Sequence, residues 1–312
     1  MTEGATPPSS PAPPLPVWKT FCEALRLVFV EHLRELPRAL LIPLVLVACL
    51  SILQSWAQEL LWISFRYDKT PYAPLKTQAL QIVGLVLKQF FITIFAVSWF
   101  RLLLVGPSDA RPHWLQTWTD RHWRFFGLLV ALQIAVYAIG VPLVSVLLWA
   151  VNPLLKALFD ALRDPSLQQA ALVISTTIWP FVFAALTLAL ARIVAPFAFL
   201  FAATTVWRGY DIKVLWISAR GSAYRFVSTL LCVGLAAEVL SQATFHLSTR
   251  AYVVGVVVGD AALKVRFVLE LLLVFVCYAV VIAVCSLAFR HCTGWVPPAR
   301  GHQKEAIARL QP

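Results

Sequence analysis

The chain is dominated by apolar runs that are long enough to cross a lipid bilayer. Each run holds about 20 residues or more, which is the length that an α-helix needs to span the hydrocarbon core. The 312 residues are 60% hydrophobic and only 13% charged, whereas soluble domains carry about 25% charged residues. A soluble fold would leave too much apolar surface in water. The sequence therefore predicts an all-α integral membrane protein.

Six apolar runs are predicted to form transmembrane helices. In chain order they cover Ala39–Gln58, Ala79–Phe100, Phe125–Trp149, Ala170–Val206, Phe226–His246 and Val265–Phe289. The fourth run is too long for one straight span, because it would reach about 55 Å against a hydrocarbon core of about 30 Å. We expect Pro180 and Pro196 to bend it, or else part of the run lies flat at the membrane surface.

Three basic amphipathic segments are predicted to lie on the cytoplasmic surface of the membrane. They are Val17–Leu36, His113–Arg124 and Asp211–Phe226. The first places Trp18 and Phe29 on one apolar face and is expected to end at Pro37. On the third, Leu215 and Ala219 share the apolar face. The basic residues opposite them, expected to meet lipid head groups, are Lys213, Arg220 and Arg225.

The distribution of basic residues predicts that both chain ends are cytoplasmic. With six spans, the chain ends and the loops on their side hold about twice as many Lys and Arg as the opposite loops. The net charge of +11 is scattered between the apolar runs, which favours contact with anionic lipid over nucleic acid binding. Residues 17–292 would form the membrane domain, between a disordered Pro/Ser-rich tail at 1–16 and a polar cytoplasmic tail at 293–312.

The order of these segments suggests a threefold internal repeat. Each unit would hold an amphipathic segment, an outward span and an inward span. The inward spans carry Arg101, Arg192 and Arg290 near their ends or within them. Because arginine is common at cytoplasmic helix ends, coincidence is the alternative explanation.

Four ionisable residues fall within the predicted spans. They are Lys88, Arg192, Glu238 and Glu270. Glu238 is the most anomalous, because it lies near the middle of the fifth span. It is either a coupling carboxylate or half of an ion pair with Arg192, or a protonated group that bonds a neighbouring helix. Lys88 has Glu59 as its simplest partner, and Glu270 lies one turn past Arg266, which indicates an interfacial position.

The sequence nominates no catalytic, metal or cofactor site. GxSxG, Walker and HExxH sequences are absent. The six cysteines form no CxxC pair, and His291, Cys292 and His302 are too loosely spaced to indicate a metal site. His113 and His122 flank an amphipathic segment and are expected to be surface groups.

The stretch Arg192–Phe226 carries a family resemblance. An intramembrane Arg192 is followed a turn later by Pro196 and then by the amphipathic segment LWISARGSAYRF. This pattern resembles the bacterial family of multi-span proteins that includes YciC and the membrane domain found attached to some glycerophosphodiester phosphodiesterases. The resemblance implies an integral protein of the bacterial inner membrane, without established activity for the membrane part itself.

Three functions are compatible with these features. The first is a non-enzymatic membrane component that packs against lipid or against other membrane proteins. The second is a transporter-like carrier that works through Glu238 and Arg192. The third, a lipid-related membrane enzyme, is suggested only by the phosphodiesterase-linked resemblance.

Overall fold

The computed structural model describes the chain at residues 15–68, 73–106, 118–135, 138, 142, 187–188, 191–206, 212–253 and 259–295. Every regular element in these ranges is a helix and none is a strand, which confirms the predicted all-α class. Four of the helices are long and apolar enough to cross a membrane, which indicates a membrane-embedded protein. Parts of the predicted third and fourth spans lie outside the described residues, as do nearly all of both predicted tails.

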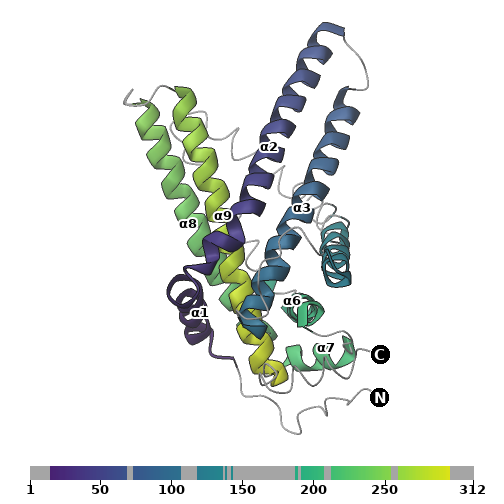
Figure 1. Cartoon of the computed structure of the whole chain (residues 1–312), viewed down its shortest axis with the longest axis vertical. Coiled ribbons are helices and arrows are strands. Elements are labelled where there is room, and N and C mark those ends of the chain that lie inside the picture. Colours follow the sequence, from purple (N-terminus) through teal and green to yellow (C-terminus); the bar gives the residue numbers. More distant parts are fainter. Residues whose placement is uncertain are drawn as a thin grey trace, which may run out of the picture.

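The four long helices form two antiparallel hairpins. α2 (Glu35–Asp68) packs on α3 (Ala73–Val105), and α8 (Ala223–Val253) packs on α9 (Gly259–Thr293). The hairpins meet where α3 crosses α9 and diverge toward the top of Figure 1. We name the two ends of the molecule the converging end and the far end. These helices correspond to the predicted first, second, fifth and sixth spans, and each is longer than predicted at both ends.

Buried contacts join α3 to α9 near the converging end. The indole Nε1 of Trp99 donates a hydrogen bond to the main-chain oxygen of Ala279 at 3.1 Å. The Phe95 ring meets the Phe275 ring edge-on, with 5.5 Å between the ring centroids. Trp99 and Phe95 are both completely buried. The second span was predicted to end at Phe100, but α3 continues to Val105, and Trp99 is a core residue.

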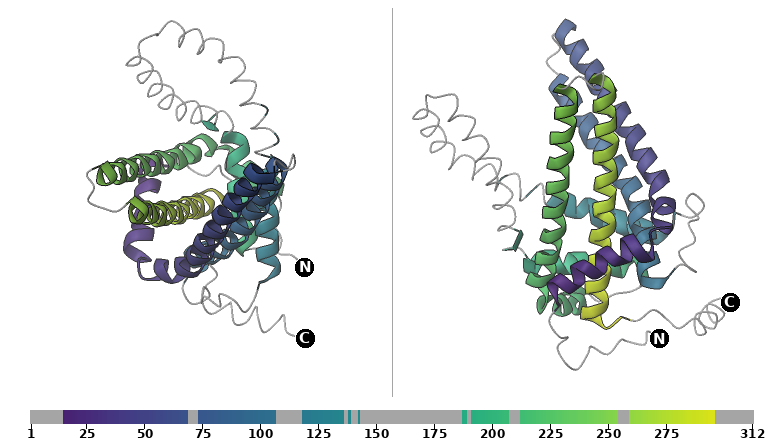
Figure 2. Two further views of the ribbon diagram at one scale, coloured as in Figure 1. Left: turned by 90° about the horizontal axis from the view of Figure 1, so that it is seen from above. Right: turned by 90° about the vertical axis from the view of Figure 1, so that its left-hand side faces the viewer.

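The first amphipathic helix, α1 (Val17–Arg26), lies across α8 and α9 at the converging end (Figure 2). Its inward side is formed by Thr20, Ala24 and Val28, the last in the π-helical turn that follows α1. The predicted apolar face was wrong in part, because Trp18 is 69% exposed and Phe29 is 41% exposed. Small side chains allow close approach between helices, so Thr20 and Ala24 take the packed side, while Phe21 is half-buried beside them and Trp18 stays outside.

Two predicted amphipathic segments are interrupted where they were expected to be continuous. The first passes into a π-helical turn at Leu27–Glu31 before α2 begins. Pro37 does not end a helix but lies in the first turn of α2. N–H groups in the first turn have no acceptor within the helix, so a proline there removes no helical hydrogen bond. The third segment stops with α7 (Ile212–Arg220), and α8 begins at Ala223 after a short turn. Arg225 therefore belongs to α8 and not to α7.

A short apolar helix, α6 (Ala191–Val206), lies within the converging end and packs against α3, α7, α8 and α9. Its 16 residues give a length of about 24 Å, which is shorter than the hydrocarbon core. Ala191 and Ala195 are completely buried, as expected of small residues that let helices approach closely. Pro196 is inside the helix and does not end it.

Both ends of the described chain lie at the converging end. Leu15 is buried. The carbonyl of Pro16 accepts hydrogen bonds from the amide and the hydroxyl of Thr20, and these bonds close the first turn of α1. These two residues therefore belong to the folded domain, although the sequence placed them in the disordered tail. Trp295 follows the end of α9 at the same end of the molecule.

Candidate functional site at the converging end

The helix α7 presents apolar and basic side chains together on its outer surface. Leu215 and Ala219 are buried against the body of the protein, as their shared face predicted. Ile217 is 70% exposed, and Lys213 and Arg220 are exposed beside it. A surface that combines exposed apolar and basic groups is suited to the boundary between acyl chains and head groups.

Two further basic residues from the predicted set lie close to α7. Arg225 is exposed in the first turn of α8. Arg192 is exposed at the start of α6, with its guanidinium carbon 5.6 Å from the centre of the Tyr224 ring. This distance allows a cation–π interaction between the two side chains. The structure therefore places Arg192 beside the beginning of α8.

Glu238 lies far from Arg192. Tyr224 and Glu238 are fourteen residues apart on α8, which corresponds to about 21 Å along the helix axis. Glu238 is exposed, and its Oε1 accepts a hydrogen bond from Nε2 of Gln242 at 2.8 Å. The structure does not bring Glu238 and Arg192 together as an ion pair.

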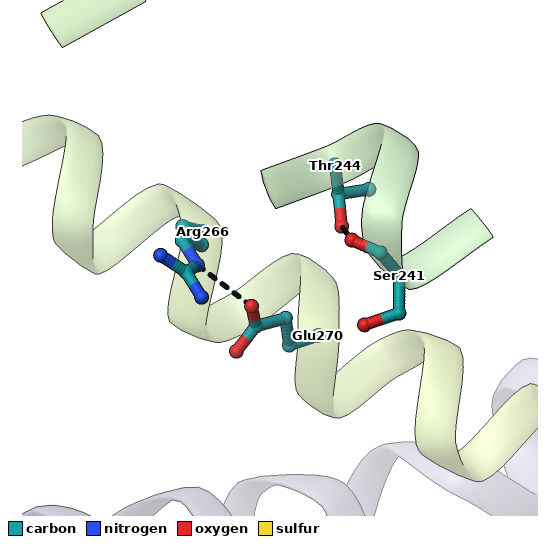
Figure 3. Close-up of polar contacts among 4 residues, drawn as sticks. All are labelled: Ser241, Thr244, Arg266 and Glu270. Carbon is teal, nitrogen blue, oxygen red and sulfur yellow. Dashed lines mark hydrogen bonds and ion pairs between the residues drawn. The ribbon is translucent and has the colours of Figure 1, made fainter. Parts of the chain in front are cut away.

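Glu270 is paired within its own helix near the far end. Nε of Arg266 donates to Oε1 of Glu270 at 2.7 Å, one turn along α9. Figure 3 shows Ser241 and Thr244 of α8 beside this pair. The Thr244 hydroxyl donates to the Ser241 carbonyl at 2.8 Å. Both charged side chains are partly exposed, so the pair is of the kind that contributes little to stability.

Lys88 is half-buried on α3 and is not level with Glu59. Gly84 of α3 faces the side chain of Gln54 on α2. In an antiparallel pair this register places Lys88 level with Leu50, about 14 Å along the axis from the level of Glu59. The expected pairing of Lys88 with Glu59 is not among the ion pairs of the described residues.

Arg290 joins the ends of α9 and α3. Its Nη2 donates to the main-chain oxygens of Leu103 at 2.5 Å and of Leu104 at 2.9 Å. These carbonyls belong to the last turn of α3, where intrahelical partners are missing. The helix then ends at Gly106, which has a φ of +105° that a glycine adopts readily. Arg290 acts as a positively charged cap on another helix.

The sequence analysis did not predict the cluster of cationic and aromatic side chains beside α3. Arg101, Arg121 and His122 are half-buried, and the Trp118 ring stacks on the Phe90 ring with 4.1 Å between the centroids. His122 was expected at the surface, but burial, followed by the charges of Arg101 and Arg121, lowers the pKa of its imidazole. Perturbed pKa values of this kind cluster at functional sites, which makes His122 a candidate site residue. The available signal for this cluster in the sequence was Trp118, which lies close to Arg121 and Arg124.

The described residues contain no group of three or more His, Cys, Asp and Glu side chains that could hold a metal ion. All six cysteines are free thiols, and Cys285 and Cys292 are buried in α9. His291 and Cys292 end α9, whereas His302 and His113 lie outside the described residues. The converging end offers cations, aromatic rings and apolar side chains, together with exposed carboxylates such as Asp120.

No protein family, no curated protein and no solved structure matches this chain.

Proposed function

We propose that this protein is a non-enzymatic component of the bacterial inner membrane that packs against anionic lipid head groups at its converging end. The observation that carries the proposal is the outer surface of α7. Ile217 is exposed there together with Lys213 and Arg220, while Leu215 and Ala219 anchor the helix. Apolar side chains in the acyl boundary and basic side chains among phosphates would hold such a helix in the interface.

The proposed orientation places the converging end in the cytoplasm. Most basic residues of the described chain lie at that end, which the positive-inside rule assigns to the cytoplasmic side. Both chain ends would then be cytoplasmic. The proposed total of crossings is six, an even number that leaves both chain ends on one side.

The threefold repeat and the relationship to the YciC-like family belong to the same proposal. Arg101 and Arg290 lie near the C-terminal ends of α3 and α9, which supports equivalent positions in two of the units. Arg192 departs from this pattern, because it lies fourteen residues before the end of α6 at Val206. The family relationship rests on the pattern between Arg192 and Phe226 and brings no phosphodiesterase chemistry with it.

A transporter-like carrier is the alternative function, and it has less support. A coupled pair needs Glu238 and Arg192 within reach of each other, whereas about 21 Å of α8 separates Glu238 from the residue that Arg192 contacts. The exposed position of Glu238 and its bond from Gln242 fit a locally satisfied carboxyl group. For a lipid-related enzyme, the sequence nominates no nucleophile, and the described residues contain no group that could hold a metal ion.

The test compares the lipids that accompany the protein out of the membrane. A variant with Lys213→Gln, Arg220→Gln and Arg225→Gln is extracted in polymer-bounded discs beside the wild type, and the lipids are quantified by mass spectrometry. We expect the ratio of anionic to zwitterionic lipid to fall, because each basic group near the surface contributes about 1 kcal/mol of attraction. Lys76→Gln, at an exposed lysine of the far end, is the control. An unchanged ratio in the triple variant would overturn the proposal.

A further inference from the structure

A carboxyl group and an amide side chain lie on the outward side of α8, within the length that can cross a membrane. Glu238 is exposed about 22 Å along the axis from the start of α8 at Ala223, and the candidate span continues to Thr244. Gln242 is exposed one turn further along, and its Nε2 donates to Oε1 of Glu238 at 2.8 Å. Glu238 therefore falls inside the candidate span, six residues before its end.

The surface around this pair is apolar and is not covered by another described helix. Leu235 and Val239 share the face of the pair, at helical spacings of three and four residues, and are 50% and 68% exposed. Among the described helices α8 packs on α9, α1 and α6, and Figure 1 shows it on the outer side of α9, away from α2 and α3. Polar side chains within membrane spans almost always face protein or a water-filled cavity, because lipid tails offer them no hydrogen bonds. This face is therefore suited to contact with another protein helix.

The bond between Glu238 and Gln242 leaves a donor and an acceptor on this face. The amide nitrogen of Gln242 has two N–H groups, and the bond to Glu238 uses one of them. The carboxyl group of Glu238 has two oxygens, and the same bond occupies only Oε1. The second N–H and the second oxygen belong to exposed side chains one turn apart. A surface that offers both a donor and an acceptor in this way is complementary to a second copy of itself.

We propose that this face of α8 is the contact surface between two copies of the chain. Two copies inserted in the same direction are related by a twofold axis along the membrane normal, so their α8 helices run parallel and each face meets its own copy. Gln242 of each copy donates its second N–H to Glu238 of the other, which closes a ring of four hydrogen bonds. Leu235 and Val239 pack around this ring against the same residues of the second copy.

The chemistry of the face favours a second copy over lipid or a different protein. Acyl chains would cover Leu235 and Val239 but would leave the polar pair without further hydrogen bonds. A protein of another sequence would need its own donor and acceptor at this depth, whereas a second copy brings both by symmetry. The inference goes beyond the proposed function, because the contact requires neither anionic lipid nor the basic residues of α7.

The first test measures self-association in vesicles of phosphatidylcholine, which contain no anionic lipid. Full-length chains labelled with a donor or an acceptor fluorophore are reconstituted together, and energy transfer is followed as the lipid-to-protein ratio is raised. We expect a dimer whose dissociation constant rises about tenfold in Gln242→Leu, which corresponds to about 1.4 kcal/mol. Gln81→Leu is the matched control, because Gln81 is an exposed glutamine of α3 on the other hairpin. Energy transfer equal to that of randomly distributed chains, or equal association of Gln242→Leu and wild type, would overturn the proposal.

Two substitutions of Glu238 separate hydrogen bonding from charge. Glu238→Gln still accepts a bond from Gln242 and still presents polar atoms to the second copy, so we expect association to be retained. Glu238→Leu removes the acceptor and should weaken association about as much as Gln242→Leu. Both side chains are exposed, so none of these substitutions should lower the melting temperature of the monomer. Association that persists undiminished in Glu238→Leu would overturn the hydrogen-bonded ring.

Site-specific cross-linking identifies what covers the face. A benzophenone amino acid at Val239 is irradiated in membranes of cells that make two differently tagged copies, and Ile82, which is 62% exposed on α3, is the control position. We expect Val239 to give a cross-link between the two tagged copies that maps to α8, and Ile82 to give none to α8. A cross-link from Val239 only to residues 143–186 of its own chain, or only to another protein, would overturn the proposal.

Discussion

The indole N–H of Trp99 on α3 donates to the carbonyl of Ala279 on α9, across 180 residues of sequence. The bond lies at the crossing of the two hairpins, where both residues are completely buried. In an apolar environment a donor of this kind has no water to replace its partner. This hydrogen bond therefore holds the α2–α3 hairpin against the α8–α9 hairpin.

Replacing Trp99 by Phe is expected to destabilise the protein. The variant loses one buried hydrogen bond, which contributes about 1 kcal/mol, and leaves a small cavity that adds to the loss. Thermal unfolding in detergent measures the change as a lower melting temperature. Trp56→Phe is the matched control, because Trp56 is 61% exposed on α2, and we expect it to be nearly neutral. Equal effects of the two substitutions would contradict the assigned role of Trp99.

Replacing Arg290 by Gln is expected to loosen the C-terminal end of α3. The guanidinium bonds to Leu103 and Leu104 are charge-assisted, and hydrogen bonds to charged groups contribute about 1.5–3 kcal/mol each before solvent exposure reduces them. Amide hydrogen exchange should become faster at the end of α3. Arg225→Gln serves as the control, since Arg225 is exposed on α8. Unchanged exchange in Arg290→Gln would show that the cap is dispensable.

Replacing Gly84 by Ala tests the close approach of α2 and α3. An added Cβ would lie 2.6 Å from Cδ and Oε1 of Gln54. Gln54 is a flexible side chain and its Oε1 has no hydrogen-bond partner among the described residues, so it can move aside at a cost of about 1 kcal/mol. Melting temperatures in a double-mutant cycle measure this cost. We expect Gly84→Ala to lower the melting temperature in the wild-type background and not in the Gln54→Ala background. Gly234→Ala, which meets open space, is the control.

The stability of the protein should fall as the pH is lowered through the range in which histidine titrates. Burial, then Arg101 and Arg121, lowers the pKa of His122 in the folded state. The unfolded chain, with an ordinary pKa of about 6.5, therefore binds the proton first, and stability present above that pH is lost below it. Melting temperatures from pH 7.5 to pH 5.5 measure the slope, which His122→Gln should reduce.

An NMR titration of His122 checks the cause of this shift. Arg101→Gln removes one of the two charges that act on the ring, so the pKa of His122 should rise toward its ordinary value. Arg38→Gln, which removes a charge that does not act on His122, should leave the titration unchanged. A His122 titration that is the same in Arg101→Gln and wild type would rule out a charge effect of Arg101 on His122.

Replacing Glu238 by Gln distinguishes a membrane component from a carrier. Glu238 is exposed and bonded only to Gln242 among the described residues, so the substitution keeps a polar side chain and should change neither abundance nor melting temperature. A component that packs against lipid should keep its lipid ratio in this variant. Loss of a transport phenotype at normal abundance would instead favour the carrier.

The sequence alone determined the helical class and the location of four long helices. α2, α3, α8 and α9 each contain a predicted apolar run, because membrane-spanning length and hydropathy are properties of a continuous segment. The packed side of α7 was also predictable, since Leu215 and Ala219 share a face at helical spacing. These features depend on neighbours in the chain and not on the rest of the fold.

Only the tertiary structure decided which side chains meet. Arg290 reaches the end of α3 across 187 residues, and Trp99 was recognisable as a core residue only once α9 was in place. The stacking of Trp118 on Phe90 likewise joins separate segments. An amphipathic pattern cannot distinguish a side that packs on protein from one that meets lipid, because both surroundings are apolar. For this reason the packed side of α1 appeared only in three dimensions.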